Sequence, residues 1–225
     1  MTNLEIKQVL IKNNVNQLYH ANTVETSLSF LKSGGLLSRG LCIDMGLPQT
    51  PQYTDYQDKK YGIFYDVFFD SVEIQKITGK STYGPVLFVY KIDVLDTLPE
   101  GSIKITKKNP DKWKISDIDA DKYFLDIREI SSGYKPRDFG QHITLREQHR
   151  PLSFDYLKKI VISDPQKENN SLFDAAYQSI LTQIKTIGLE VSFKIRDYSL
   201  FDSFWKYYND SNKLKMHFDL GGHKI

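Results

Sequence analysis

The chain lacks the features that mark several large classes of protein. It has one cysteine, Cys42, among 225 residues; this excludes an internal disulfide framework and favours a reducing compartment. No apolar run is long enough to span a bilayer, so we expect no contact with a membrane. The first residues, 1–5, lack the basic-then-apolar pattern of a secretory signal. These absences predict a cytoplasmic protein.

Signatures of phosphate and metal binding are also scarce. No glycine-rich loop follows a predicted strand, which argues against the classical nucleotide-binding folds. The 5 histidines show no tight ligand spacing, so we expect no metal. His142 and His149 do flank Glu147, however, and a metal-dependent nuclease built on these three residues stays an alternative. Nuclease activity that depends on an added metal ion would support this alternative.

The net charge is only +2, so the chain is not a general binder of polyanions. One segment, 104–114, nevertheless carries five lysines and a tryptophan. Lysines neutralise phosphates, and an exposed aromatic ring stacks on an unpaired base. The functional interpretation is nucleic-acid binding through Lys107, Lys108, Lys112 and Trp113. A solvated turn with Trp113 packed inward is the competing interpretation, and a non-catalytic module that binds nucleic acid or a partner protein is a further alternative.

The apolar content of 40%, with 13 Phe and 14 Tyr, predicts a folded chain. We expect one domain over residues 1–225, with its core at about 17–197 and an aromatic helix and tail at 198–225. Hydrophobic periodicity predicts an α+β class, with a mixed, strand-rich core and flanking helices. The expected helices are 4–11, the segment after Thr23, 172–187 and 200–208. The expected strands are 17–19, 62–70, 86–92, 123–130, 144–148, 157–163 and 189–195. We expect loops at 39–61 and 131–139, and a poorly ordered tail after 209.

The most informative stretch is Leu18-Tyr19-His20-Ala21-Asn22 and the amphipathic segment that follows it. Thr23 is a suitable N-cap, and Val24, Leu28 and Leu31 have the spacing of one helical face. Gly34-Gly35 supplies the stop, because glycine enters the left-handed conformation without steric cost. A histidine at the end of a first strand, over a helix, faces whatever the fold binds.

This ordered set resembles the DarT-type ADP-ribosyltransferase toxins, which open on Tyr-His, a helix, a glycine and a Leu-Leu pair. Residues 66–69 and 85–89 are similar to that family's central strand and the strand after it, and the resemblance spans roughly 18–195. It implies an ADP-ribosyltransferase fold of two packed sheets, with NAD as substrate. It also implies transfer to a nucleic-acid base, preferably in single-stranded DNA but also in RNA, and a toxin or phage-defence role with an antitoxin partner.

The resemblance also implies site residues. Glu147 sits where the family has its catalytic glutamate, and strand alternation is expected to place it on one face with Leu145. Such a carboxylate stabilises the oxocarbenium-like sugar when the glycosidic bond of NAD breaks. Arg39 is the arginine nearest to the family's catalytic one, with Lys59 and Lys60 as substitutes.

The remaining expected contacts are to the dinucleotide. His20 is expected to bind ribose hydroxyls, because a neutral imidazole both donates and accepts. The loop after Arg39 is expected to form a lid that carries stacking rings. The residues assigned to cofactor binding are His20, Ala21, Asn22, Ser38, Tyr53 and Tyr61.

Overall fold

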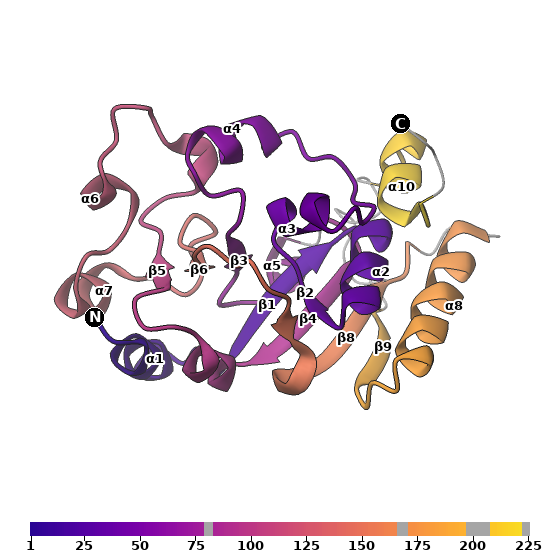
Figure 1. Cartoon of the computed structure of the whole chain (residues 1–225), viewed down its shortest axis with the longest axis horizontal. Helices are drawn as coiled ribbons and strands as arrows, with labels where there is room; N and C mark the ends of the chain where they lie inside the picture. The colour runs from indigo at the N-terminus through magenta and orange to yellow at the C-terminus, as the bar shows by residue number, and fades with distance from the viewer. Residues whose placement is uncertain (79–82, 166–170, 197–207, 222–225) are drawn as a thin grey trace.

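A computed structural model describes residues 1–78, 83–165, 171–196 and 208–221. Its largest sheet has the strand order β1-β4-β8-β9, formed by Gln17–Asn22, Val86–Lys91, Leu157–Ser163 and Ser192–Arg196 (Figure 1). The β1–β4 and β4–β8 pairs are antiparallel, whereas β9 runs parallel to β8. Residues Val86 to Tyr90 of β4 are all buried, as their continuous apolar run predicts for a central strand.

A second sheet of three short strands lies beside the first. Its order is β3-β6-β5, formed by Val67–Phe69, Ile143–Leu145 and Ile103–Ile105. Two backbone hydrogen bonds between Tyr19 and Asp70, each 2.9 Å, join β1 to the end of β3. A two-stranded ladder of β2 (Gly35–Leu36) and β7 (Leu152–Ser153) completes the described strands. This arrangement confirms the α+β class.

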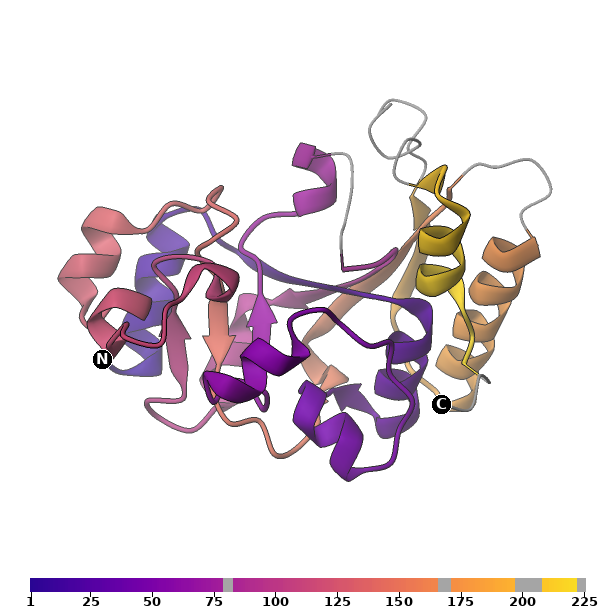
Figure 2. The ribbon, with the colours of Figure 1, turned by 90° about the horizontal axis from the view of Figure 1, so that it is seen from above.

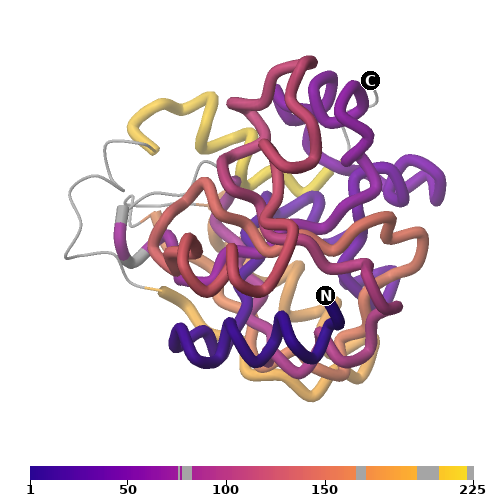
Figure 3. Tube along the Cα trace, turned by 90° about the vertical axis from the view of Figure 1, so that its left-hand side faces the viewer, coloured from indigo at the N-terminus to yellow at the C-terminus, as the bar shows by residue number. Residues whose placement is uncertain are grey.

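Helices cover the sheets at both ends of the molecule. Helices α2 (Val24–Ser33), α8 (Ser171–Thr186) and α10 (Ser211–Phe218) pack together, and Figure 2 shows α8 and α10 side by side. At the opposite end α1 (Asn3–Lys12) packs on α7 (Ile127–Gly133), and Figure 3 shows α1 as an indigo coil along one edge. The main hydrophobic core draws residues from Ile6 through Phe218. The other described helices are α3 (Arg39–Asp44), α4 (Asp55–Lys60), α5 (Ile74–Thr78) and α6 (Asp119–Lys122), with 3₁₀ turns at Ile92–Thr97, Pro110–Lys112 and Phe154–Tyr156.

The predicted helix after Thr23 is confirmed together with both of its ends. The Thr23 side chain accepts a hydrogen bond from the amide of Thr26, and Gly34 closes the helix at φ +76°. The predictions for 4–11, 86–92, 157–163 and 172–187 are confirmed as α1, β4, β8 and α8. Most of the predicted helix at 200–208 lies outside the described residues.

Five predictions from the sequence are wrong in whole or in part, and local hydrogen bonding explains each. The strand predicted at 62–70 shortens to β3, because turn hydrogen bonds from the amides of Ile63 and Asp66 precede it. Residues 39–61 contain α3 and α4 instead of a long loop, because Ser38 caps α3 and Arg39 pairs with Asp55. Residues 123–130 are not a strand, because Asp126 caps α7.

The other two wrong predictions concern the end of strand β6 and the C-terminal segment. The strand predicted at 144–148 stops at Leu145, and Glu147 lies beyond it at φ +52°, so strand alternation does not place Glu147 on the face of Leu145. The segment after 209 forms α10, which Asp210 caps and which buries His217 and Phe218.

Candidate functional site

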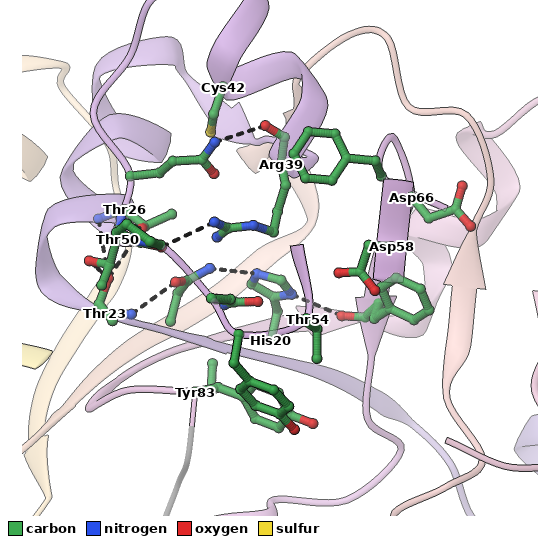
Figure 4. A pocket seen from close by; sticks show the side chains of 18 of the residues that line it. His20, Thr23, Thr26, Arg39, Cys42, Thr50, Thr54, Asp58, Asp66 and Tyr83 are labelled. Carbon is green, nitrogen blue, oxygen red and sulfur yellow. Dashed lines mark hydrogen bonds between the residues drawn. The ribbon is translucent and has the colours of Figure 1, made fainter. Parts of the chain in front are cut away.

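A cavity of about 300 Å³ opens where β1, α2 and the end of β3 meet (Figure 4). Apolar side chains form much of its wall, and they come from α2, α3 and the segment before β3. The segments 49–54 and 109–111 and helix α10 also contribute lining residues. A largely apolar hollow with a few convergent polar groups is the usual form of a small-molecule site. The apolar lining residues include Phe30, Leu37, Cys42, Ile63, Phe64 and Phe68.

His20 lies in this cavity with its ring orientation fixed. Nδ1 is 2.8 Å from the carbonyl oxygen of Phe68, so Nδ1 carries the proton and donates. Nε2 is left as an acceptor; among the described residues, the side-chain amide of Asn22 lies 3.4 Å from it. Burial lowers the pKa of His20, which keeps the ring neutral. A neutral imidazole with an acceptor nitrogen in a cavity can receive a hydrogen bond from a ligand hydroxyl.

Arg39 supplies the cation of the cavity. Nη2 donates to Asp55 at 2.7 Å and to the carbonyl oxygen of Thr50 at 3.1 Å, and Nε lies 2.5 Å from the same carboxylate. The side chain is only 15% exposed, and Nη1 has no hydrogen-bond partner among the described residues. A held guanidinium with one unpartnered nitrogen is arranged to bind an anionic or carbonyl oxygen.

A cluster of hydroxyl groups lies beside Arg39 at the start of α2. The hydroxyls of Thr23 and Thr50 are 2.7 Å apart, and the amide of Thr50 donates to the hydroxyl of Thr26 at 3.0 Å. Thr50 also donates to Glu25 at 3.2 Å. These bonds fasten the segment that holds the Arg39 guanidinium to the first turn of α2, so the cation and His20 are held on neighbouring walls.

Carboxylates line the side of the cavity that faces β3. Burial raises the pKa of Asp58 and of Asp66 to about 6 each. The side chain of Asp66 is fully buried; it pairs with Nε of Arg146 at 3.0 Å and accepts from the backbone amide of Glu147 at 3.0 Å. Asp70, at the end of β3, lies 3.0 Å from Nδ1 of His142. Acidic groups and a cation thus occupy one hollow, which is typical of a catalytic site.

The structure places the residues predicted from the sequence unevenly. His20, Ala21, Asn22, Arg39 and Tyr53 line the cavity, and Tyr53 is 85% exposed. Two predicted contacts lie behind the wall. Ser38 caps α3 and donates to the carbonyl oxygen of Gln148 at 3.0 Å, and Tyr61 donates to the carbonyl oxygen of Trp113.

Glu147 does not line the cavity. Its side chain is exposed, and its backbone amide holds Asp66, which does form part of the wall. A φ of +52° is uncommon for a residue other than glycine and costs about 1–3 kcal/mol. Its catalytic role stays a prediction.

The lysine-rich segment differs from the expected binding face. Trp113 is 4% exposed and packs against Tyr61 and Tyr123, contrary to the exposed stacking ring that nucleic-acid binding would use. Lys107 pairs with Glu129 at 3.0 Å, and Lys108 pairs with Asp117 at 2.6 Å. Lys112 is exposed. None of these four residues lines the cavity.

His142 and His149 do not form the ligand set of a metal site. His142 faces Asp70, whereas the ring of His149 packs on Tyr65 with centroids 4.7 Å apart. Within the described ranges, no three His, Cys, Asp or Glu side chains come together as metal ligands. No helix in that same part of the chain has the length and apolarity to cross a membrane.

Sequence reasoning assigned several cavity residues to no part of this site, and it considered His142 only as part of a metal site. Asp66 and Asp70 bracket the buried strand β3, and His142 directly precedes the buried strand β6. The sequence signal that could have identified these residues is a polar residue at the end of a short apolar run. The contribution of α10 through Met216 and His217 had none, because the segment reads as a polar tail.

Comparison with known proteins gives a match at the level of fold. No family model and no curated protein sequence matches the chain. Among solved structures, Thermus sp. 2.9 DarT in complex with ADP-ribosylated ssDNA is similar, with a TM-score of 0.50 and 13% identity over 81% of this chain and 95% of that one. The same DarT in complex with NAD+ gives a TM-score of 0.49 at 14% identity, over 81% and 96%. The chain therefore has a fold similar to that of DarT.

Proposed function

We propose that this chain is an NAD-dependent ADP-ribosyltransferase that modifies a base in nucleic acid, with single-stranded DNA as the preferred acceptor. The observation that carries the proposal is the pairing of His20 and Arg39 in one cavity. The first is a neutral ring with an acceptor nitrogen, and the second is a held guanidinium with an unpartnered Nη1. The similar fold of a DarT whose structure contains ADP-ribosylated ssDNA supports it.

The residues take roles that follow from their chemistry. Arg39 binds the pyrophosphate of NAD through Nη1, and Nε2 of His20 accepts from a ribose hydroxyl. The apolar wall receives the nicotinamide ring. The bond between the ribose C1′ and the nicotinamide nitrogen breaks, nicotinamide leaves with the electron pair, and C1′ develops positive charge. Glu147 stays the proposed carboxylate that stabilises this charge, although its side chain lies outside the cavity and only its backbone amide contacts Asp66.

The acceptor reaches the cavity at its exposed tyrosines. Tyr53 is 85% exposed and Tyr83 is 37% exposed, and both line the cavity. An unpaired base has the flat face that stacks on such rings, and a base must leave the duplex stack to be modified. Single-stranded nucleic acid is therefore the acceptor class that the cavity mouth favours.

The test uses NAD labelled in its adenylate half, together with separate pools of single-stranded DNA, duplex DNA, RNA and cell protein. We expect label transfer to single-stranded DNA by the intact chain and loss of transfer in Arg39→Ala. Arg128→Ala is the matched control, because Arg128 is exposed and lies outside the cavity. Absence of both transfer and nicotinamide release with every pool would contradict the proposal.

We also propose a toxin or phage-defence role in the cytoplasm, with an antitoxin as partner. Modified bases block templating, so expression of the chain in a bacterial host should arrest growth. Arg39→Ala should relieve the arrest at an equal protein level. Growth arrest that persists in this variant would argue against a role for the transferase activity.

A further inference from the structure

The pair formed by Asp70 and His142 has no role in the NAD contacts described above. Strands β3 and β6 are antiparallel neighbours, with Phe69 opposite Ile143. Asp70 directly follows β3 and His142 directly precedes β6, so the register brings the two side chains together. Oδ1 of Asp70 lies 3.0 Å from Nδ1 of His142, and both residues line the cavity.

The imidazole of His142 is held on several sides. Its backbone amide donates to the hydroxyl of Thr106 at 2.7 Å, and its ring packs edge-on against Phe68 with centroids 6.0 Å apart. The side chains of His142 and Asp70 are 7% and 16% exposed. Because the carboxylate accepts from Nδ1, the neutral ring presents Nε2 as a lone-pair acceptor. Nε2 makes no hydrogen bond to the described residues.

This is the arrangement of a general base with an orienting carboxylate. Two of the other polar residues of the cavity, Asp66 and His20, serve this role less well. The side chain of Asp66 is fully buried against Arg146, and Nδ1 of His20 is bonded to a carbonyl oxygen while Nε2 faces Asn22. Nε2 of His142 is a basic nitrogen of the cavity that makes no hydrogen bond to the described residues.

We propose that His142 is the catalytic residue that takes the proton from the acceptor, with Asp70 as its positioning residue. This inference rests on the proposed function. As nicotinamide departs with the electron pair of the C1′–N bond, a ring nitrogen or hydroxyl oxygen of the acceptor forms a bond to C1′. The proton on that atom passes to Nε2 of His142 and then to solvent. The acceptor atom is thus one that carries a proton before attack.

The test separates bond cleavage from transfer. Nicotinamide release and labelled acceptor are both measured for the intact chain, for His142→Asn and for His142→Ala. The asparagine amide can keep the donor to Asp70 while Nε2 is lost. We expect transfer to fall about 100-fold or more, since a general base contributes about 10²–10⁴. Nicotinamide release should fall much less, because water captures the cation in place of the acceptor. The ratio of hydrolysed to transferred ADP-ribose should therefore rise.

Rescue by imidazole and one further variant, Asp70→Asn, distinguish a chemical role from a structural one. Added imidazole should restore transfer in His142→Ala, because it fits the space left by the side chain. Asp70→Asn should lower transfer with little change in the Kd for NAD. Equal falls in release and transfer in His142→Asn, or no rescue by imidazole in a folded His142→Ala, would overturn the inference. A wild-type chain that neither releases nicotinamide nor transfers label would instead refute the proposed function.

Discussion

Replacement of Arg39 by lysine tests whether ligand binding needs the several hydrogen-bond donors of a guanidinium or only a positive charge. The guanidinium meets Asp55 with two nitrogens and Thr50 with one, and its buried Nη1 has no hydrogen-bond partner among the described residues. An ammonium keeps the charge, but it cannot hold Asp55 and the Thr50 carbonyl and also reach the ligand. The variant should fold and bind NAD weakly.

The expected loss follows from one charge-assisted hydrogen bond. Such a bond contributes about 1.5–3 kcal/mol, which corresponds to roughly a 10- to 100-fold rise in Kd. The fold itself should lose only about 1 kcal/mol, because the side chain of Asp55 is 26% exposed and solvent replaces part of the ion pair. Binding should therefore suffer more than stability.

Calorimetric titration with NAD measures the first quantity, and urea unfolding measures the second. Arg128→Lys is the matched control, since Arg128 lies exposed on α7, away from the cavity. A Kd for NAD in Arg39→Lys within about threefold of the wild-type value would refute the reasoning, because one hydrogen bond of this kind is worth at least tenfold.

Three further predictions concern the frame of the cavity. Gly84 has φ +132°, and a Cβ there would lie 2.3 Å from the backbone of Asn22, so Gly84→Ala should cost more than about 2 kcal/mol in urea unfolding. Gly46→Ala, at φ +63° with nothing within 4 Å, should cost only about 1 kcal/mol; equal losses would contradict the clash. Burial lowers the pKa of His217 from 6.5 to about 4, so the unfolded chain takes up a proton first as pH falls. The neutral, buried His217 therefore contributes up to about 3 kcal/mol to the free energy of unfolding above pH 6.5, and this contribution is lost as the pH falls towards 4. In urea unfolding at several pH values, the stability difference between wild type and His217→Gln should shrink across that window, and a constant difference would contradict this. Burial raises the pKa of the Cys42 thiol to about 11, so a thiol reagent at pH 7.5 should label it only after unfolding; rapid labelling of the native chain would show that the thiol is accessible.

The sequence predicts an element well when the spacing of its apolar residues and the residues at its two ends indicate the same structure. Thr23 and Gly34 bracket the face of α2, and the uniform apolar run of β4 belongs to a buried strand. Short helices escape such reasoning, because α3 has six residues and depends on the Ser38 cap and the Arg39–Asp55 pair more than on an apolar stripe.

The site residues that the sequence predicts are those that lie close together in one short segment. His20 and Asn22 follow from the first strand, and both line the cavity. Asp70 and His142 are 72 positions apart in sequence and meet only through the register of β3 with β6. Without the pairing of these strands, Asp70 does not stand out, and His142 stands out only as a neighbour of Glu147 and His149. The burial of Trp113 likewise depends on Tyr123, which only tertiary contact brings near.

The ion pairs within the lysine-rich segment have a consequence for how the chain meets a polyanion. Lys104, Lys107 and Lys108 already face Asp119, Glu129 and Asp117. A lysine with an internal carboxylate partner releases few counterions from a nucleic acid, so affinity should fall only gently as salt is added. Long-range steering is also weak at a net charge of +2. Association with a nucleic-acid acceptor would then be slow and nearly independent of salt, and stacking would hold the acceptor. Because stacking needs an unpaired base, the acceptors that can be modified are those that are already single-stranded.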